Sequence, residues 1–437
     1  MSEHAIDHTH IDDLAAFVTA SPTSYHAAAE VASRLDAAGF TGLQETDDWS
    51  SVTTAGTSNI GAYVVRDGAV IAWQLPADAA PTTPFRIVGT HTDSPAFQLK
   101  PNPDLGAHGY RQAALEVYGG PLLNSWLDRE LELAGRLVTR DGTEHLVRTG
   151  PFLRIPQLAI HLDRDVNDSL TLDRARHLSP VFGVGRISPG DLVAHLAGLA
   201  GLDAGDVVGH DVLTADTAAP ARFGLDGTLF ASARLDNLIS VHAGLVALLD
   251  SSDSAAGNDA GHVNVLAAFD HEELGSASRS GASGTFLLDV LARIGAGLGA
   301  TPDEQARAYA GSWCVSSDSG HAVHPNYPER HDLTNRPVLG GGPLRKVNAN
   351  QRYATDAHGS ALWSRCCAAA GVPMQEFVSV NTIPCGSTIG PLTATRLGIR
   401  VVDVGVAQLS MHSARELCHV ADPPALTAAL QSFYAGS

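Results

Sequence analysis

Two adjacent carboxylates, Glu272 and Glu273, follow an apolar run in the segment AAFDHEELGS, which spans residues 267–276. Each carboxylate disfavours the ionised form of its neighbour, so the pair is unfavourable beside a hydrophobic segment unless something offsets the charge. Successive side chains at a strand end point in different directions, so one glutamate can bind a metal ion while the other reaches a water molecule beside it. These two residues alone leave open which glutamate takes which part.

Four further segments place acids or histidines where a predicted buried strand stops. In IVGTHTDS, His91 and Asp93 are two residues apart and share a face, so Asp93 can orient the His91 ring. The other positions are Asp236 in SARLDNLIS, Asp318, His321 and His324 in VSSDSGHAVHPN, and His412 in QLSMHSARE. Two histidines with three carboxylates suit zinc, manganese or cobalt. A carboxylate shared by two ions is the common device of two-metal hydrolases.

These positions also have purely structural explanations. Asp236 precedes a helical run and could cap the N-terminus of that helix. His412 precedes the capping-box pattern of Ser413 to Glu416, which predicts that a helix starts one residue after the histidine. The glutamate pair could lie in a solvated turn. Separate structural roles would not require an oxygen or imidazole ligand at all five strand ends. The sequence therefore favours a shared metal site.

Other catalytic patterns fit poorly. No histidine follows His271 at the spacing of a single-zinc HExxH site. The segment SGASGTF around Ser283 lacks the GxSxG spacing of a nucleophile elbow. The segment LGGGPLRK lacks the spacing of a P-loop, and we interpret it as a flexible or close-approach loop.

The elements that must position these residues alternate between helix and strand. Apolar spacing predicts helices over residues 11–20 and from residue 26 to a stop at Gly39, then a hairpin over 59–75 that turns at Asp67 and Gly68. After residue 226 the alternation resumes, with predicted strands at 262–269, 313–318 and 400–406 and helices at 238–249, 283–295, 361–371 and 423–436. This order predicts the α/β class, a three-layer domain with a central mixed sheet whose site lies at the strand ends.

Residues 98–225 differ in character because they are rich in strands. The pattern predicts a hairpin over 131–149, strands at 155–162 and 206–213, and one helix at 188–201. We therefore expect a discontinuous catalytic domain of residues 1–97 and 226–437, interrupted by an inserted β-rich domain of residues 98–225.

Composition excludes several classes of function. The chain of 437 residues has 28 basic and 47 acidic residues and a net charge of −19, so a basic surface for nucleic acid or anionic membrane is not expected. No apolar run approaches the roughly 18 residues of a membrane helix, and the N-terminal sequence lacks the features of a signal peptide. The five cysteines show no CxxC spacing and are expected to be reduced thiols, so the prediction is a soluble cytoplasmic protein.

Taken in order, the motifs resemble those of the M18 aspartyl aminopeptidases. They are GTHTDSPAF, RLDN, HEELGS, DSGHAVHPNYPERH, GGPLRKVNANQRYATD, PCGSTIGP and QLSMHSARE, and they span essentially the whole chain. The resemblance implies a metallo-aminopeptidase that removes N-terminal Asp or Glu from peptides with a water shared by two divalent ions. Zinc is the first expectation for these ions, with manganese or cobalt as alternatives. It also implies that the inserted β-rich domain is a dimerisation domain.

The resemblance assigns individual roles. The implied ligands are His91, Asp236 and Asp318 for one ion, and Asp236, Glu273 and His412 for the other. Glu272 would be the general base and Asp93 the orienting carboxylate. Where the family commonly has a bulkier residue and then Ala after the equivalent of Asp318, this chain has Ser and Gly, which bears on fine substrate preference.

Substrate recognition is also implied by the resemblance. Lys346 matches the lysine that pairs with the acidic side chain of the substrate, and His321 and Tyr353 match substrate-contacting positions. His161 matches a histidine contributed by the neighbouring subunit of a homo-oligomer, expected to be a tetrahedral dodecamer built from dimers. The alternative is a metal-dependent deacylase or an aminopeptidase of other specificity on the same fold. A non-catalytic scaffold protein is disfavoured because no ligand position is lost.

Overall fold

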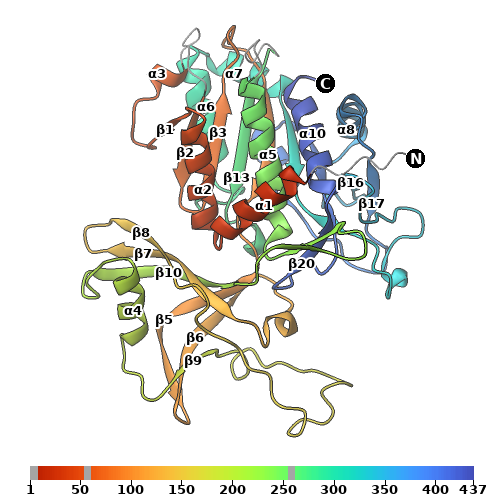
Figure 1. Cartoon of the computed structure of the whole chain (residues 1–437). Coiled ribbons are helices and arrows are strands. Elements are labelled where there is room, and N and C mark those ends of the chain that lie inside the picture. The colour runs from red at the N-terminus through yellow and green to blue at the C-terminus, as the bar shows by residue number, and fades with distance from the viewer. Residues whose placement is uncertain (1–7, 54–60, 254–260) are drawn as a thin grey trace.

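A computed structural model describes residues 8–53, 61–253 and 261–437 of the chain (Figure 1). A large mixed sheet of nine strands forms its centre, in the α/β class that the sequence predicts. In sheet order the strands are β1 (Thr41–Leu43), β2 (Ala62–Arg66), β3 (Ala69–Gln74), β13 (Val263–Phe269), β4 (Phe85–His91), β14 (Trp313–Ser317), β18 (Arg400–Gly405), β16 (Leu344–Val347) and β17 (Gln375–Val378). The four central strands, β13, β4, β14 and β18, run parallel to one another.

Helices cover both faces of this sheet. One face packs against α1 (Thr9–Ala20), α2 (Ser24–Ala37), α5 (Leu235–Asp253), α8 (Ala357–Ala370) and α10 (Asp422–Tyr434). The other packs against α3 (Ser50–Thr53), α6 (Phe286–Gly297), α7 (Pro302–Gly311) and α9 (Ile389–Leu397). Along β13, Leu266 and Ala268 join the first core while Val265 and Ala267 join the second, as the alternation of side chains along a strand requires. Both faces being covered explains why β13 is apolar throughout.

The segment between β4 and β12 forms a second sheet with its own apolar core, and we call residues 96–216 the insertion segment. Its strands are, in sheet order, β8 (Glu144–Arg148), β7 (Leu131–Thr139), β10 (Val207–Asp216), β5 (Ala96–Ala107), β6 (Tyr110–Tyr118) and β9 (Val181–Val184). Helix α4 (Asp191–Leu199) packs against this sheet. Figure 1 shows the insertion segment below the large sheet.

Two small sheets and three short 3₁₀ turns complete the described chain. The first sheet joins β11 (Ala221–Phe223), β12 (Leu229–Ser232) and β20 (Glu416–His419), and the second joins β15 (Gly320–His321) to β19 (Ala407–Gln408). The turns are η1 (Leu123–Trp126), η2 (Glu272–Leu274) and η3 (Pro328–Arg330).

Most predicted elements are confirmed, and two are wrong. The hairpin of β2 and β3 turns at Asp67, whose φ of 55° is the left-handed conformation that such turns require. The predicted strand at 155–162 does not form: Ile155 makes an isolated bridge, and Pro156 then removes a backbone donor, so the chain becomes irregular. The predicted helix after His412 is also absent, because residues 411–415 form turns and β20 begins at Glu416.

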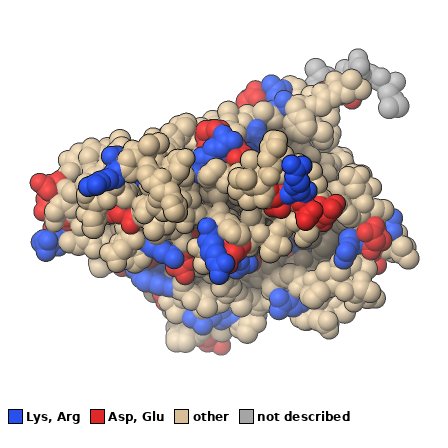
Figure 2. All heavy atoms as spheres, turned by 90° about the horizontal axis from the view of Figure 1, so that it is seen from below, with Lys and Arg blue, Asp and Glu red and all other residues tan. Residues whose placement is uncertain are grey.

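The surface carries charges of both signs. On the face seen from below in Figure 2, basic and acidic side chains are interspersed rather than gathered into one basic field. No helix within residues 8–53, 61–253 and 261–437 combines the length and apolarity needed to cross a membrane. Residues 1–7, which include the first part of the N-terminal sequence judged above, lie outside the described residues.

Candidate metal centre and active site

Three neighbouring parallel strands, β13, β4 and β14, end at the same edge of the large sheet and bring the predicted site residues there. His91 is the last residue of β4, Glu272 and Glu273 follow β13 in η2, and Asp318 directly follows β14. A Cβ on Gly405 of β18 would lie 1.7 Å from the carbonyl oxygen of Asp318. Only glycine therefore lets the chain at Asp318 approach β18 this closely.

Asp236 lies between two histidines and directs one carboxylate oxygen toward each of them. Its Oδ1 is 3.5 Å from Nε2 of His91, and its Oδ2 is 3.5 Å from Nε2 of His412. Asp318 Oδ1 lies 3.4 Å from the same His91 nitrogen, and Glu273 Oε2 lies 3.4 Å from the same His412 nitrogen. Asp236 is therefore placed to be shared between two groups of ligands, and it is not the N-terminal cap of a helix.

The donor set fits divalent cations. Each of the two groups, His91 with Asp236 and Asp318, and Asp236 with Glu273 and His412, has its ligand atoms within 4.8 Å of one another. Imidazole with carboxylate is a set that zinc accepts. Among the described residues, no hydrogen-bond donor reaches the buried Oδ1 of Asp236, which leaves that oxygen available to a cation. The structure thus brings all five predicted ligand positions together.

The electrostatics of this cluster favour cations. Burial disfavours the charged form of His91, yet the carboxylates of Asp236, Asp318 and Asp93 outweigh it and hold the pKa of His91 well above its usual range. Burial likewise opposes protonation of His412, but Asp236 and Glu273 raise its pKa to about 10. The same two histidines lower the pKa of Asp236 against the effect of its burial. The centre therefore carries a negative field that protons or metal ions can offset.

The two glutamates of HEELGS have different surroundings. Both glutamates line the cavity in front of the cluster, and Oε2 of Glu273 also lies 3.4 Å from Nε2 of His412. Burial raises the pKa of Glu272 to about 8, with the carboxylates of Asp318 and Asp93 adding to the effect. Asp93 fixes the backbone of both glutamates, because its Oδ1 accepts the N–H of Glu272 at 3.0 Å and its Oδ2 accepts that of Glu273 at 3.1 Å. Asp93 Oδ1 also lies 3.4 Å from Nδ1 of His91.

A cavity of about 460 Å³ opens in front of the metal cluster. Lys346, His321 and Tyr353, the predicted substrate-binding residues, all line it. The Lys346 side chain is only 2% exposed, its Nζ donates to the carbonyl of Ser319 at 2.6 Å, and it lies 3.4 Å from Oδ2 of Asp318. The Tyr353 ring lies 5.4 Å from the same ammonium group. Lys346 can therefore act on a ligand in the cavity and on a metal ligand at once.

His161 is not brought to this cavity. It lies in the irregular part of the insertion segment, exposed to solvent among Leu158, Ile160 and Leu162, whose side chains are 55%, 51% and 75% exposed. Within one chain, His161 has no place among the residues that line the cavity.

The insertion segment contributes two contacts that sequence reasoning missed. The hydroxyl of Tyr118, at the end of β6, donates to Oδ2 of Asp93 at 2.9 Å. The carbonyl of Gly120 lies 3.0 Å from Nδ1 of His412 and can accept its proton, which leaves Nε2 for a metal ion. Nothing in the spacing of these residues indicates the contacts, because each joins positions far apart in the chain.

Arg234 is a further residue that the sequence did not single out. It is partly buried, its guanidinium donates to the carbonyl of Thr92, and shielding from solvent lowers its pKa to about 10 against the opposing field of Asp93 and Asp270. Arg234 and His412 have φ values of 56° and 66°. Left-handed backbone costs about 1–2 kcal/mol for a residue with a side chain, so the surrounding contacts must hold both residues in place.

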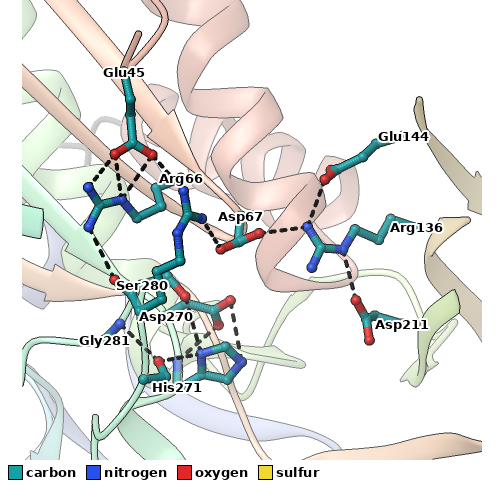
Figure 3. A network of polar contacts seen from close by, with 12 residues as sticks. Glu45, Arg66, Asp67, Arg136, Glu144, Asp211, Asp270, His271, Ser280 and Gly281 are labelled. Atoms are coloured by element: carbon teal, nitrogen blue, oxygen red, sulfur yellow. Dashed lines mark hydrogen bonds and ion pairs between the residues drawn. The ribbon is translucent and has the colours of Figure 1, made fainter. Parts of the chain in front are cut away.

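Polar contacts around Asp67, Asp270 and His271 anchor the loop that carries the glutamates (Figure 3). His271, also left-handed, contacts the hydroxyl of Ser278 at 2.9 Å, and its N–H donates to Asp270 at 2.9 Å. Asp67 accepts from Arg279 of the same loop at 2.8 Å and from Arg136 of the insertion segment at 2.9 Å. Asp270 and His271, to which the sequence analysis gave no role, thus shape the turn, and Asp67 joins the turn to the insertion segment.

An α/β sheet that gathers histidines and carboxylates at the ends of its parallel strands defines a metal-dependent hydrolase. Residues 17–434 match the family described as "Aminopeptidase I zinc metalloprotease (M18)". The chain belongs to this M18 family of metallo-aminopeptidases.

Individual relatives agree with that assignment. The chain is 55% identical over 433 residues to a "Probable M18 family aminopeptidase 2" of Streptomyces avermitilis, covering 98% of each chain. A chain in the structure of "the Ape4 and Nbr1 complex" superposes with a TM-score of 0.93 at 37% identity, covering 98% of this chain and 85% of the other. The mApe1 dodecamer of yeast superposes with a TM-score of 0.84 at 26% identity, covering 97% and 95%.

Proposed function

We propose that this protein is a two-metal aminopeptidase that removes N-terminal Asp or Glu from peptides. The observation that carries the proposal is the position of Asp236, whose two oxygens face His91 and His412 at 3.5 Å each. His91, Asp236 and Asp318 would hold one divalent ion, and Asp236, Glu273 and His412 the other. The zinc chemistry of the family supports zinc as the native metal.

The remaining residues of the site have defined tasks in this reaction. When bound, two divalent ions would supply an acidified water and polarise the scissile carbonyl. Glu272 accepts the proton of the attacking water and returns a proton to the leaving amine. Asp93 keeps Glu272 in position through the backbone N–H of that residue. Burial of Asp93 among His91, Tyr118 and the two glutamate N–H groups leaves it little freedom to move.

Lys346 would supply the preference for acidic residues. A buried ammonium group at the wall of the cavity can pair with one carboxylate of the substrate, even though the net charge of the chain would repel it at long range. One observation favours the alternative of a deacylase or an aminopeptidase of other specificity. Lys346 already contacts Asp318 at 3.4 Å, so its task could be to support a metal ligand.

We also propose a homo-oligomer in which residues 98–225 form the dimerisation domain and residues 1–97 and 226–437 the catalytic domain. The dodecameric yeast relative and the exposed leucines and isoleucine around His161 support this arrangement. His161 would enter the cavity of the neighbouring subunit. A tetrahedral dodecamer built from dimers is the expected assembly.

A substrate panel on enzyme of defined metal content tests the proposal. Dipeptides that begin with Asp, Glu, Asn, Gln, Ala and Leu, together with N-acetyl amino acids, are assayed at fixed zinc. We expect two ions per chain and turnover of the Asp and Glu peptides at least about 100-fold above that of Asn and Gln, the scale of a charge-assisted contact. Equal turnover of Asp and Asn peptides, or turnover of the N-acetyl amino acids alone, contradicts it.

A further inference from the structure

Glu416 contacts the backbone of two proposed metal ligands at once. Its Oε2 accepts the N–H of Asp236 at 2.8 Å, and its Oε1 accepts the N–H of His412 at 2.7 Å. Asp236 follows β12 while His412 lies in the turn between β19 and β20, so the two ligands come from distant parts of the chain. We infer that Glu416 is a positioning residue that fixes the shared ligand Asp236 relative to His412, and this inference rests on the proposed two-metal function.

The sheet explains how Glu416 reaches both ligands. Strands β12 and β20 are antiparallel, and Ser232 pairs with Glu416 at the end of the ladder. The chain that continues from β12 toward Asp236 therefore passes beside the Glu416 side chain. Glu416 is only 2% exposed, so water does not compete for its two oxygens. Both oxygens are used by backbone donors, so this carboxylate is not itself free to bind an ion.

The two ligands are each held at a second point. The carbonyl of Asp236 accepts a hydrogen bond from Ser94 at 2.6 Å, and Nδ1 of His412 faces the carbonyl of Gly120 at 3.0 Å. His412 also has the left-handed backbone that a side chain disfavours. The bond from its N–H to Glu416 stabilises that conformation. Without Glu416 the turn is expected to relax, and Nε2 of His412 would move away from Asp236.

Asp93 fixes the backbone of the two glutamates in the same way. One carboxylate, Asp93, accepts the N–H groups of Glu272 and Glu273, and the other, Glu416, accepts those of Asp236 and His412. Arg234 is a partly buried cation whose charge acts on both carboxylates. Four site residues are thus fixed through their backbones, which leaves their side chains free for ligands and protons.

Glu416→Gln tests this inference. The amide has one acceptor oxygen, and its NH₂ group would face one of the two N–H donors, so one of the two bonds is lost. We expect zinc to dissociate about 10–100-fold more readily from the variant, the usual cost of losing a group that orients a metal ligand. The kcat should fall by a similar factor while KM changes little. The zinc Kd is measured on folded apo-protein by competition with a chromophoric chelator.

Asp422→Asn is the matched control. Asp422 is also a buried carboxylate that accepts two backbone N–H groups, those of Gly340 and Gly342 at 2.8 and 3.0 Å, but it contacts no proposed ligand. This variant should lose stability to a similar extent and keep the wild-type zinc Kd. If Glu416→Gln does not fold, Glu416→Asp gives the same readout, with a smaller increase in Kd because both acceptors remain on a shorter stem.

The outcomes separate the two proposals. Two zinc ions on the wild type and a wild-type Kd in the folded Glu416 variant overturn the positioning role of Glu416 alone. Fewer than two ions on the wild type overturn the two-metal function together with it. An equal loss of zinc affinity in the Asp422 control also overturns the positioning role, because the effect would then follow from general destabilisation.

Discussion

Tyr118 of the insertion segment donates a hydrogen bond of 2.9 Å to Asp93, the carboxylate that holds the backbone of both active-site glutamates. Two residues later, the carbonyl of Gly120 lies 3.0 Å from His412. The end of β6 in the insertion segment therefore supports both Asp93 and His412. The position of the insertion segment and the geometry of the site are consequently coupled.

Tyr118→Phe should lower activity without emptying the site. Loss of this bond leaves one oxygen of buried Asp93 with fewer donors, which is expected to cost about 1–3 kcal/mol of stability. We expect kcat to fall about tenfold and the number of bound zinc ions to stay the same. Steady-state kinetics and thermal unfolding measure both effects, with Tyr110→Phe as the control, because Tyr110 lies on the same strand and is 50% exposed. Wild-type kinetics in Tyr118→Phe would contradict this coupling.

Glu272→Gln should abolish turnover and retain the metal. The amide cannot accept the proton of the attacking water, and loss of a general base costs about 100- to 10,000-fold in rate. Because Glu272 is not one of the five proposed metal ligands, metal content by elemental analysis should match the wild type. Near-normal activity in this variant would show that another residue is the base.

Lys346→Met should remove the preference for acidic residues. Methionine preserves the length of the side chain and its packing against Tyr353 but carries no charge. We expect the ratio of kcat/KM between Asp and Asn peptides to fall about 10- to 100-fold, as loss of a charge-assisted contact predicts. An unchanged ratio with weaker zinc binding would instead identify Lys346 as a support of Asp318, as the alternative function requires.

Mixing two inactive variants should restore activity if His161 acts between subunits. His161→Ala chains keep Glu272, and Glu272→Gln chains keep His161. In a mixed dimer, the site with Glu272 receives His161 from its partner, so part of the activity should return after the two are unfolded and refolded together. The same variants assembled separately and then mixed serve as the control. No recovery above that control would place His161 outside the neighbouring site.

Asp67→Asn should change the pH dependence of stability. Burial opposes ionisation of Asp67, but Arg136 and Arg279 outweigh it and lower its pKa below the usual 3.8. A lowered pKa stabilises the fold above the pKa of the unfolded state, and this contribution disappears as the pH falls through the folded-state value. The free energy of unfolding of the variant should therefore be about 1–2 kcal/mol lower than that of the wild type at pH 7, and equal to it in strong acid. Most of this loss comes from the ion pair with Arg136, which is less exposed than Arg279. Urea unfolding from pH 2 to 7 measures this difference. A difference that does not vary with pH contradicts it.

The sequence could predict that the proposed ligands cluster, because strand ends and side-chain chemistry are local properties. His91 ends its strand while Asp318 and the glutamate pair follow theirs, and parallel neighbours must end at one edge of the sheet. Strand geometry allows either glutamate to bind the metal while the other acts on the water. The family resemblance alone assigned Glu273 to the metal and Glu272 to the water.

The supporting residues could not be predicted in this way. Glu416 lies four residues after His412, the spacing that suggested a helix cap, but its carboxylate binds the backbone across a small sheet. The same four-residue spacing therefore fits both a capped helix and a turn that leads into a strand. The pairing of β20 with β12 selects the strand. Tyr118 gave no signal because a tyrosine at a strand end is ordinary, and Arg234 gave none because its burial depends on the fold of distant segments.

The chain enters the insertion segment directly after Asp93 and returns through β12 just before Arg234 and Asp236. Both connections are thus part of the site, with β5 beginning at Ala96 and β12 ending at Ser232. Removing the insertion segment would therefore cut the chain on both sides beside residues of the proposed reaction centre. Evolutionary variation should accordingly concentrate in the exposed loop around residues 156–180, while the two crossings are inherited together with the catalytic machinery.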